Sequence, residues 1–191
     1  MITLRTFFLT SRRSELSAGE LCRRLLLSCV VGVTALAGCS ALSEKAKSLV
    51  NSPAPESRLM LLSGEHIALR SLVGKDVVLL FWATWCPHSR SGIQEFEALA
   101  RRYRERADIQ FYAVSVDAND SYEELQNRVR IQDLRSMIHV FSGNDVQDEA
   151  FLAFHGERLP YAVFIDSGGT VRFADLGVGG LASFLEARYQ S

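Results

Sequence analysis

Cysteines are scarce in this sequence, and their positions argue against a fold held together by disulfides. Three of the four, Cys22, Cys29 and Cys39, lie in or at the edge of one N-terminal apolar stretch, and only Cys86 lies in the body of the chain. A small domain that relies on disulfides carries several cysteines within that domain. With 191 residues, of which 48% are hydrophobic, the chain can instead bury one ordinary globular core. A disulfide framework and a disordered chain are therefore both excluded.

Clustered metal ligands and clustered positive charge are also lacking. His66, His139 and His155 stand singly, and Cys86 with His88 offers too few ligands for a structural metal site. The formal net charge is -1, and no basic stripe runs through the sequence. Nucleic-acid-binding proteins need such a stripe to neutralise phosphates. We therefore expect no metal, no cofactor and no nucleic-acid partner.

Charged residues are absent from 25–43, directly after a start that is rich in arginine. This is the order of a basic n-region and an apolar h-region in a secretory signal peptide. The apolar run ends in Leu36-Ala37-Gly38-Cys39, which resembles the lipobox of bacterial lipoproteins, where the cysteine receives a lipid. We expect a signal peptide over 1–38 and a lipid on Cys39. An uncleaved transmembrane anchor is the alternative.

The position of Cys39 also predicts where the protein resides. Residues 39–57 are largely polar, contain Pro53 and Pro55, and indicate a tether between the lipid and a folded domain. The protein would then be anchored in the cell envelope and face the periplasm or another extracytoplasmic space. Ser40 is not aspartate, which slightly favours the outer membrane by the sorting rule of Gram-negative lipoproteins.

The remaining residues, 58–191, alternate between patterns typical of strands and of helices. A continuous apolar run at 77–82 predicts a central strand covered on both faces, and helical spacing over 86–106 predicts a helix packed on the sheet. Before this strand and helix, the sequence predicts a hairpin at 58–62 and 66–69. After them it predicts a strand at 109–116, a helix that opens with a capping box from Ser121 to Glu124, and a strand at 137–141. The last predicted elements are a helix at 145–155 with Val146, Ala150, Phe151 and Phe154 inward, strands at 161–165 and 170–176, and a helix at 180–189. This order predicts an α/β domain with a mixed sheet.

The residues most able to perform chemistry are Trp85-Cys86-Pro87-His88-Ser89, at the junction of the central strand and the long helix. Unpaired backbone N–H groups converge on the first residue of a helix, and they favour the thiolate form of a cysteine placed there. His88 can add a positive charge near the sulfur, and Pro87 suits the first helical turn because it has no N–H to lose. A buried, inert cysteine beside a core tryptophan is the alternative.

The segment Phe81-Trp82-Ala83-Thr84-Trp85-Cys86-Pro87 resembles the active-site entry of thioredoxin-like proteins, especially the membrane-tethered thiol-disulfide oxidoreductases of the TlpA/ResA type. Segments 72–78 and 160–166 are similar to that family as well. The resemblance implies a thioredoxin fold, in which helices flank a mixed central sheet, with an N-terminal β-hairpin extension. It also implies that Pro160 is a cis-proline against the Cys86 sulfur, and that Trp85, Pro87, Leu159 and Pro160 contact the substrate.

The chain departs from the Cys-x-x-Cys motif of that family, because Ser89 replaces the second cysteine. Ser89 cannot attack a mixed disulfide, but its hydroxyl can donate a hydrogen bond to the Cys86 thiolate. The acids that the family places near the second cysteine are also replaced, by Leu80 and Gly92. The residues that would resolve a mixed disulfide are therefore missing as a set.

Two functions remain open. The first is an envelope thiol-disulfide oxidoreductase or isomerase that acts through Cys86 alone, with an external thiol to resolve its adducts. Its partners would be envelope proteins with cysteines, or a low-molecular-weight thiol. The second is a redox-inactive module that holds an extended client segment in a groove around Trp85, Leu159 and Pro160.

Overall fold

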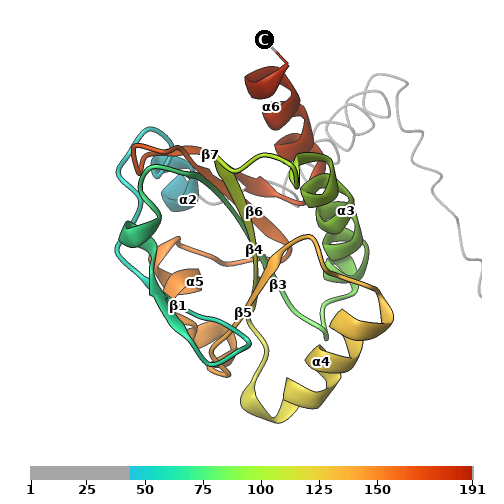
Figure 1. The fold of residues 1–191 in the computed structure, drawn as a ribbon. Coiled ribbons are helices and arrows are strands. Elements are labelled where there is room, and N and C mark those ends of the chain that lie inside the picture. The colour runs from blue at the N-terminus through green and yellow to red at the C-terminus, as the bar shows by residue number, and fades with distance from the viewer. Residues whose placement is uncertain (1–43, 191) are drawn as a thin grey trace, which may run out of the picture. The chain divides into compact units, whose positions relative to one another are not determined.

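The computed structural model describes residues 44–190. The predicted signal peptide and Cys39 lie outside these residues. At the centre of the domain is a mixed five-stranded sheet (Figure 1). Its strand order is β5 (Ile138–Phe141), β4 (Ile109–Ser115), β3 (Asp76–Trp82), β6 (Tyr161–Ile165) and β7 (Val171–Leu176). Strands β3, β4 and β5 are parallel, while β6 and β7 run antiparallel to their neighbours, which confirms the predicted mixed α/β sheet.

Strand β3 forms the middle of the core because all seven of its residues are buried. Its side chains alternate between the two faces of the sheet, as the pleat of a strand requires. Val78, Leu80 and Trp82 join one apolar cluster, whereas Val77 and Phe81 join the other. A continuous apolar run is therefore what a strand covered on both faces needs.

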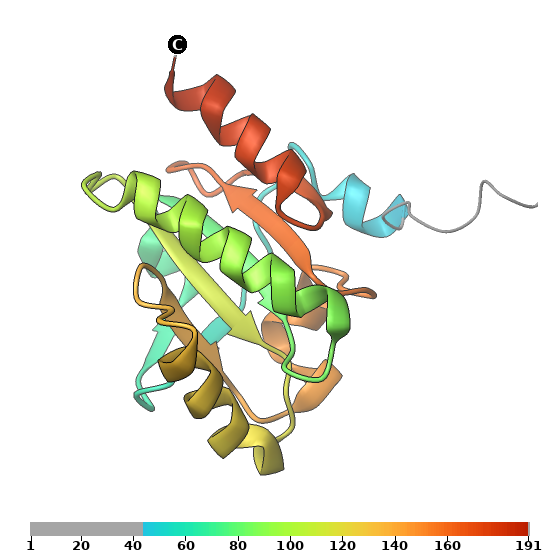
Figure 2. The same cartoon turned by 90° about the vertical axis from the view of Figure 1, so that its right-hand side faces the viewer.

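Helices cover both faces of this sheet. Helix α3 (Pro87–Tyr103) lies along one face together with α6 (Gly179–Tyr189), and α4 (Tyr122–Ile131) adds its buried Leu125 to the same cluster (Figure 2). On the other face, α2 (Glu44–Ser48) and α5 (Glu149–Ala153) contribute to the second cluster. The predicted hairpin forms as β1 (Arg58–Met60) and β2 (His66–Ala68), while short 3-10 turns η1 (Leu69–Leu72), η2 (Asn119–Ser121) and η3 (Asp145–Gln147) complete the domain.

The start of the described chain differs from the predicted tether. Residues 44–55 belong to the packed domain, since α2 buries Ala46 and the Ala54 N–H donates to the Gly169 carbonyl at 2.8 Å. Pro53 also forms a bridge with Thr170, beside the outer strand β7. Two prolines and a polar composition indicated a spacer, but they fit an extended segment that pairs with a sheet edge equally well.

Two predicted helix starts also differ. Residues 145–155 do not form one helix, because the Asp148 side chain accepts the Phe151 N–H at 2.9 Å and begins α5 anew. Val146 therefore lies on η3 and is 39% exposed, although the sequence predicts it inward. The capping box at Ser121 does not form, since its hydroxyl bonds to Asp120 instead. Within residues 44–190, no helix is both long and apolar enough to cross a membrane.

Candidate functional site

Cys86 stands where β3 gives way to α3. It is the N-cap of the helix, in an extended conformation, and Pro87 occupies the first helical turn. Only 7% of the Cys86 residue surface is exposed. Its thiol donates to the Leu159 carbonyl with a sulfur to oxygen distance of 3.8 Å. The fold therefore brings the cysteine to a loop 73 residues further along the chain, as the resemblance implies.

The Leu159–Pro160 peptide bond is cis, and Pro160 is buried directly before β6. The Pro160 ring packs against Gly92 of α3, so that a Cβ atom at position 92 would lie 2.8 Å from Pro160 Cγ. Real Cβ atoms essentially never make so close a contact. The family's glutamate at this position would thus require movement of a stiff proline ring.

Ser89 and His88 differ in how the structure places them. Ser89 is fully buried, and its hydroxyl oxygen accepts the Ala83 N–H at 3.3 Å rather than bonding to the Cys86 sulfur. It therefore ties the first turn of α3 to the end of β3, which differs from the role the sequence predicted. The His88 side chain is exposed, and no described residue forms an ion pair with it. Its influence on the sulfur stays a prediction.

A groove of about 470 Å³ opens beside Cys86. Trp85 and Leu159 line it, whereas Pro87 and Pro160, which were also expected to contact a substrate, are not among its lining residues. The structure adds Val146 and Leu152 from η3 and α5. Trp85 is 54% exposed and Leu152 48%. This wall of the groove was not predicted, because the helical spacing of 145–155 placed Val146 inward. Asp148 followed by Glu149 was the signal that a helix begins there.

Asp117, a fully buried carboxylate, was not predicted as part of the site either. It accepts the Thr84 N–H at 3.0 Å, the Thr84 hydroxyl at 2.7 Å and the Ser115 hydroxyl at 2.6 Å. Thr84 stands two residues before Cys86, so Asp117 fixes the loop that carries Cys86. An available signal was its place directly after the predicted strand 109–116, because parallel strands end at the same edge of a sheet.

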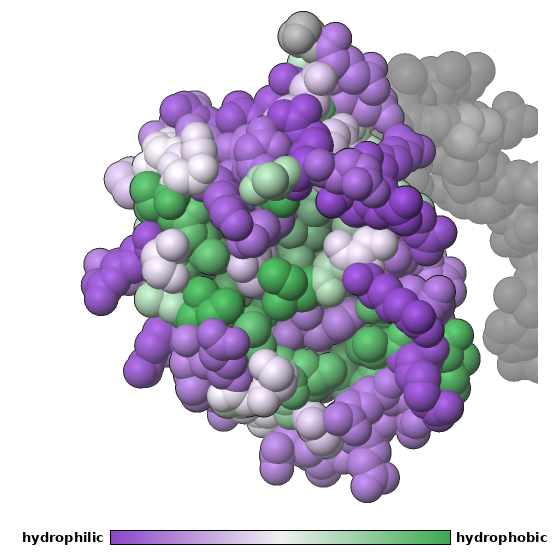
Figure 3. Space-filling view, viewed as in Figure 1, coloured by the Kyte–Doolittle hydropathy of each residue, from purple (hydrophilic) through white to green (hydrophobic). Residues whose placement is uncertain are grey.

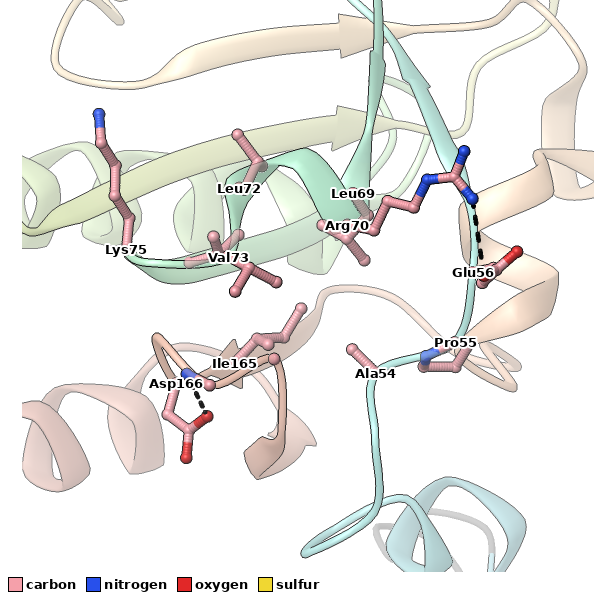
Figure 4. A pocket seen from close by; sticks show the side chains of 13 residues that line it. Ala54, Pro55, Glu56, Leu69, Arg70, Leu72, Val73, Lys75, Ile165 and Asp166 are labelled. Carbon is pink, nitrogen blue, oxygen red and sulfur yellow. Dashed lines mark hydrogen bonds and ion pairs between the residues drawn. The ribbon is translucent and has the colours of Figure 1, made fainter.

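Of the other hollows, which lie away from Cys86, two have partly apolar linings. One, of about 160 Å³, lies at the opposite end of β3, where Leu72, Val73 and Ile165 surround it (Figure 4). The other, of about 330 Å³, lies between the hairpin, β5 and α4, on a face whose middle gathers apolar residues (Figure 3). Neither contains a residue that the sequence singled out for chemistry. Within the described part of the chain, no group of three or more histidine, cysteine or acidic side chains could hold a metal ion.

Comparisons with known proteins agree with this geometry. A model of the AhpC/TSA family matches residues 50–174. The "Thiol-disulfide oxidoreductase ResA" of Bacillus cereus is 28% identical over 147 residues, which cover 77% of this chain and 80% of that protein. Among solved structures, a thiol-disulfide oxidoreductase from Bacteroides fragilis superposes with a TM-score of 0.64 at 19% identity, over 72% of this chain and 99% of that one.

A second solved structure is similar, a "putative Thiol:disulfide interchange protein DsbE" from Chlorobium tepidum. Its TM-score is 0.61 at 20% identity, over 74% of this chain and 95% of that one. At these identities the structural matches establish the thioredoxin fold.

Proposed function

Because the chain belongs to the AhpC/TSA family of thioredoxin-like proteins, we propose that it is an envelope thiol-disulfide oxidoreductase or isomerase that acts through a single cysteine. The observation that carries this proposal is the position of Cys86. It caps α3 and borders an open groove, while Ser89 occupies the place of a second thiol. A cysteine at a helix N-terminus is suited to nucleophilic attack because the helix favours its thiolate form.

The proposed reaction has two exchange steps. Cys86, having given its proton to solvent, attacks one sulfur of a client disulfide, and the other client sulfur leaves as a thiolate. A client cysteine or a low-molecular-weight thiol then attacks the mixed disulfide and releases Cys86 as a thiolate. When the attacking sulfur belongs to the client, the client's disulfide is rearranged without net oxidation. When the attacking sulfur belongs to an external thiol, the client sulfur is left joined to that thiol, and a second external thiol must attack this bond to free the client as a dithiol and leave the external thiol as its disulfide.

A redox-inactive module that holds client segments is the second candidate. The same groove favours it, because Trp85 and Leu152 are exposed for contact whether or not Cys86 reacts. Peroxide reduction is not proposed. The Thr-x-x-Cys motif of peroxiredoxins would place a threonine at 83, where this chain has Ala83.

Reactivation of a protein with scrambled disulfides separates the two candidates. We expect the natural protein to accelerate recovery when reduced glutathione is present, and Cys86→Ser to have no effect. A mixed disulfide between Cys86 and the client should be detectable by mass spectrometry when glutathione is withheld. Equal recovery with the natural protein and Cys86→Ser would favour the binding module.

The location is also part of the proposal. We infer that the mature protein begins at Cys39 and is held at the envelope membrane, with the outer membrane slightly favoured, through a lipid on that residue. Only four residues separate Cys39 from α2, and even a fully extended chain would span at most about 17 Å between Cys39 and Glu44. Intact-mass analysis tests this inference, since a mature chain whose Cys39 carries no acyl mass would contradict it.

A further inference from the structure

We propose that the groove beside Cys86 selects client disulfides in which a bulky apolar side chain stands next to the attacked cysteine. This inference rests on the proposed function and names its substrate class. Trp85, Val146 and Leu152 would be the specificity-determining residues. The occupant is an extended polypeptide segment rather than a small charged thiol.

Exposure of apolar side chains is concentrated at this groove. Six large hydrophobic residues are exposed among the described residues, and Trp85, Val146 and Leu152 are three of them. All three line the groove that also contains Cys86. Exposed apolar side chains that gather in one place, rather than singly, are typical of a surface that contacts a partner. The apolar patch is therefore continuous with the reacting sulfur.

The local backbone turns these side chains outward. Asp148 caps α5 and separates Val146, on η3, from the helix that carries Leu152. Phe151, on the same helix, is buried in the core and fixes α5 against the sheet. The Tyr161 hydroxyl donates to the Phe154 carbonyl at 3.2 Å, which holds the loop that closes the groove. The side of the groove formed by η3 and α5 is therefore held in place by these contacts.

Charge and size agree with an apolar peptide side chain. The groove also contains Glu157 and Arg158, whose charges are opposite, so no single sign of charge dominates it. Its volume of about 470 Å³ exceeds that of one side chain and lies within the usual range of ligand sites. Because only 7% of Cys86 is exposed, a client sulfur must enter beside this wall to reach it.

Matched peptides test the inference. Two tetrapeptides, Gly-Leu-Cys-Gly and Gly-Ser-Cys-Gly, are prepared as mixed disulfides with thionitrobenzoate. The Cys86 thiolate attacks the peptide sulfur, the bond between the peptide and thionitrobenzoate breaks, and coloured thionitrobenzoate leaves with the electron pair. Cys86 and the peptide are then joined by a disulfide. We expect the leucine peptide to react about tenfold faster, the lower end of the discrimination that an apolar pocket gives for one methylene group.

Variants then test whether Val146 and Leu152 cause the preference for the leucine peptide. The double variant Val146→Ser with Leu152→Ser should reduce the ratio of the two rates toward one. Ile131→Ser is the matched control, because Ile131 is 74% exposed but lies on α4 and not in the groove, and it should keep the natural ratio. Equal rates with both peptides in the natural protein, or an unchanged ratio in the double variant, would overturn the inference. If neither peptide releases thionitrobenzoate from protein whose Cys86 is shown by mass to be free, the proposed function itself fails.

Discussion

The two ends of strand β3 each lie beside a buried carboxylate, and the partners of these carboxylates differ. At the N-terminal end, Asp76 accepts from Arg188 Nε at 3.0 Å and from the Ser167 N–H at 2.7 Å, and the Tyr189 hydroxyl also donates to it. Burial and this hydrogen bond raise the pKa of Tyr189. At the C-terminal end, Asp117 accepts from uncharged groups of Thr84 and Ser115.

Because of this difference, Asp76 stabilises the fold, whereas Asp117 positions the loop of the candidate site. Asp76 joins β3 to the last turn of α6 through the oppositely charged Arg188, so its effect is on how the chain end is packed. Asp117 joins the end of β4 to the loop before Cys86, so its effect extends to Cys86. The same substitution at the two positions should therefore have different consequences.

The largest loss of stability is expected from Asp76→Asn. The change leaves Arg188 without its charged partner, and we expect the free energy of unfolding to fall by about 2 to 3 kcal/mol, less than for a fully buried pair because the Arg188 side chain is 36% exposed. Urea unfolding measures the loss. The rate at which folded Cys86 reacts with a small disulfide should stay unchanged, and a slower rate would show that this end also controls the nucleophile.

A smaller loss of stability, with a change in reactivity, is expected from Asp117→Asn. An amide offers only one acceptor oxygen and carries no charge, so the donors of Thr84 and Ser115 lose their charge-assisted hydrogen bonds to the carboxylate, at a cost of about 1 to 3 kcal/mol. We also expect Cys86 to react severalfold more slowly with the same disulfide, because Thr84 is no longer held. Asp76→Asn is the control. An unchanged rate in Asp117→Asn would mean that both carboxylates serve the fold alone.

A second thiol can also be introduced near Cys86, at the C-terminal end of β3. Ser89→Cys should confer a partial ability to reduce insulin that the natural protein lacks, because a second sulfur would lie one helical turn after Cys86. The gain is limited, since Leu80 offers no carboxylate and position 92 has no room for one beside Pro160. We also expect a cost of about 1 kcal/mol, because sulfur accepts the Ala83 N–H less well than oxygen does.

The measurement is the rate at which the pre-reduced natural protein and pre-reduced Ser89→Cys convert insulin disulfides to dithiols in a single turnover without added thiol, a reaction that in the variant leaves Cys86 and the introduced cysteine joined as a disulfide. Leu80→Asp in the Ser89→Cys background should raise turnover further, provided that the domain tolerates a carboxyl group at this fully buried position. If the natural protein already turns over insulin as fast as Ser89→Cys, the resolving step is not missing.

The smallest effect is expected on the pH dependence of stability, and it arises at neither end of β3. Burial lowers the pKa of His139 on β5, and the Leu134 carbonyl and Glu97 only partly oppose this. The unfolded chain therefore binds a proton before the folded one does, and stability should fall as the pH drops below about 6.5. Thermal unfolding between pH 7 and 5 should show a smaller decrease for His139→Gln than for the natural protein. Equal decreases would place the pH sensitivity elsewhere.

The sequence predicted the central features of the fold because they depend on long, regular patterns. The run at 77–82 and the helical spacing after Cys86 correspond to β3 and α3 within a few residues. Features that depend on one hydrogen bond were missed. Asp148 divides 145–155 because its side chain competes for a single N–H, and Ser89 bonds to Ala83 because that N–H lies at the end of a strand.

In the same way, part of the candidate site was predicted from the sequence and part was not. Cys86 and Leu159 meet as the resemblance implies, since the motif fixes both segments. Asp117 and Leu152 belong to no motif, and only the three-dimensional arrangement brings them to the nucleophile or its groove. A sequence pattern in one segment does not show which distant side chain will form hydrogen bonds with the backbone of that segment.

The short segments that flank the sheet have a consequence for association between copies of the protein. Residues 51–54 bond to the start of β7, and the Leu62 N–H donates to the His139 carbonyl on β5. On each outer strand, segments of the same chain thus form hydrogen bonds with part of the backbone N–H and C=O groups that would otherwise be unpaired. Natural sheets avoid pairing with the edge strands of other molecules in this way. At high protein concentration, this arrangement disfavours aggregation through strand addition.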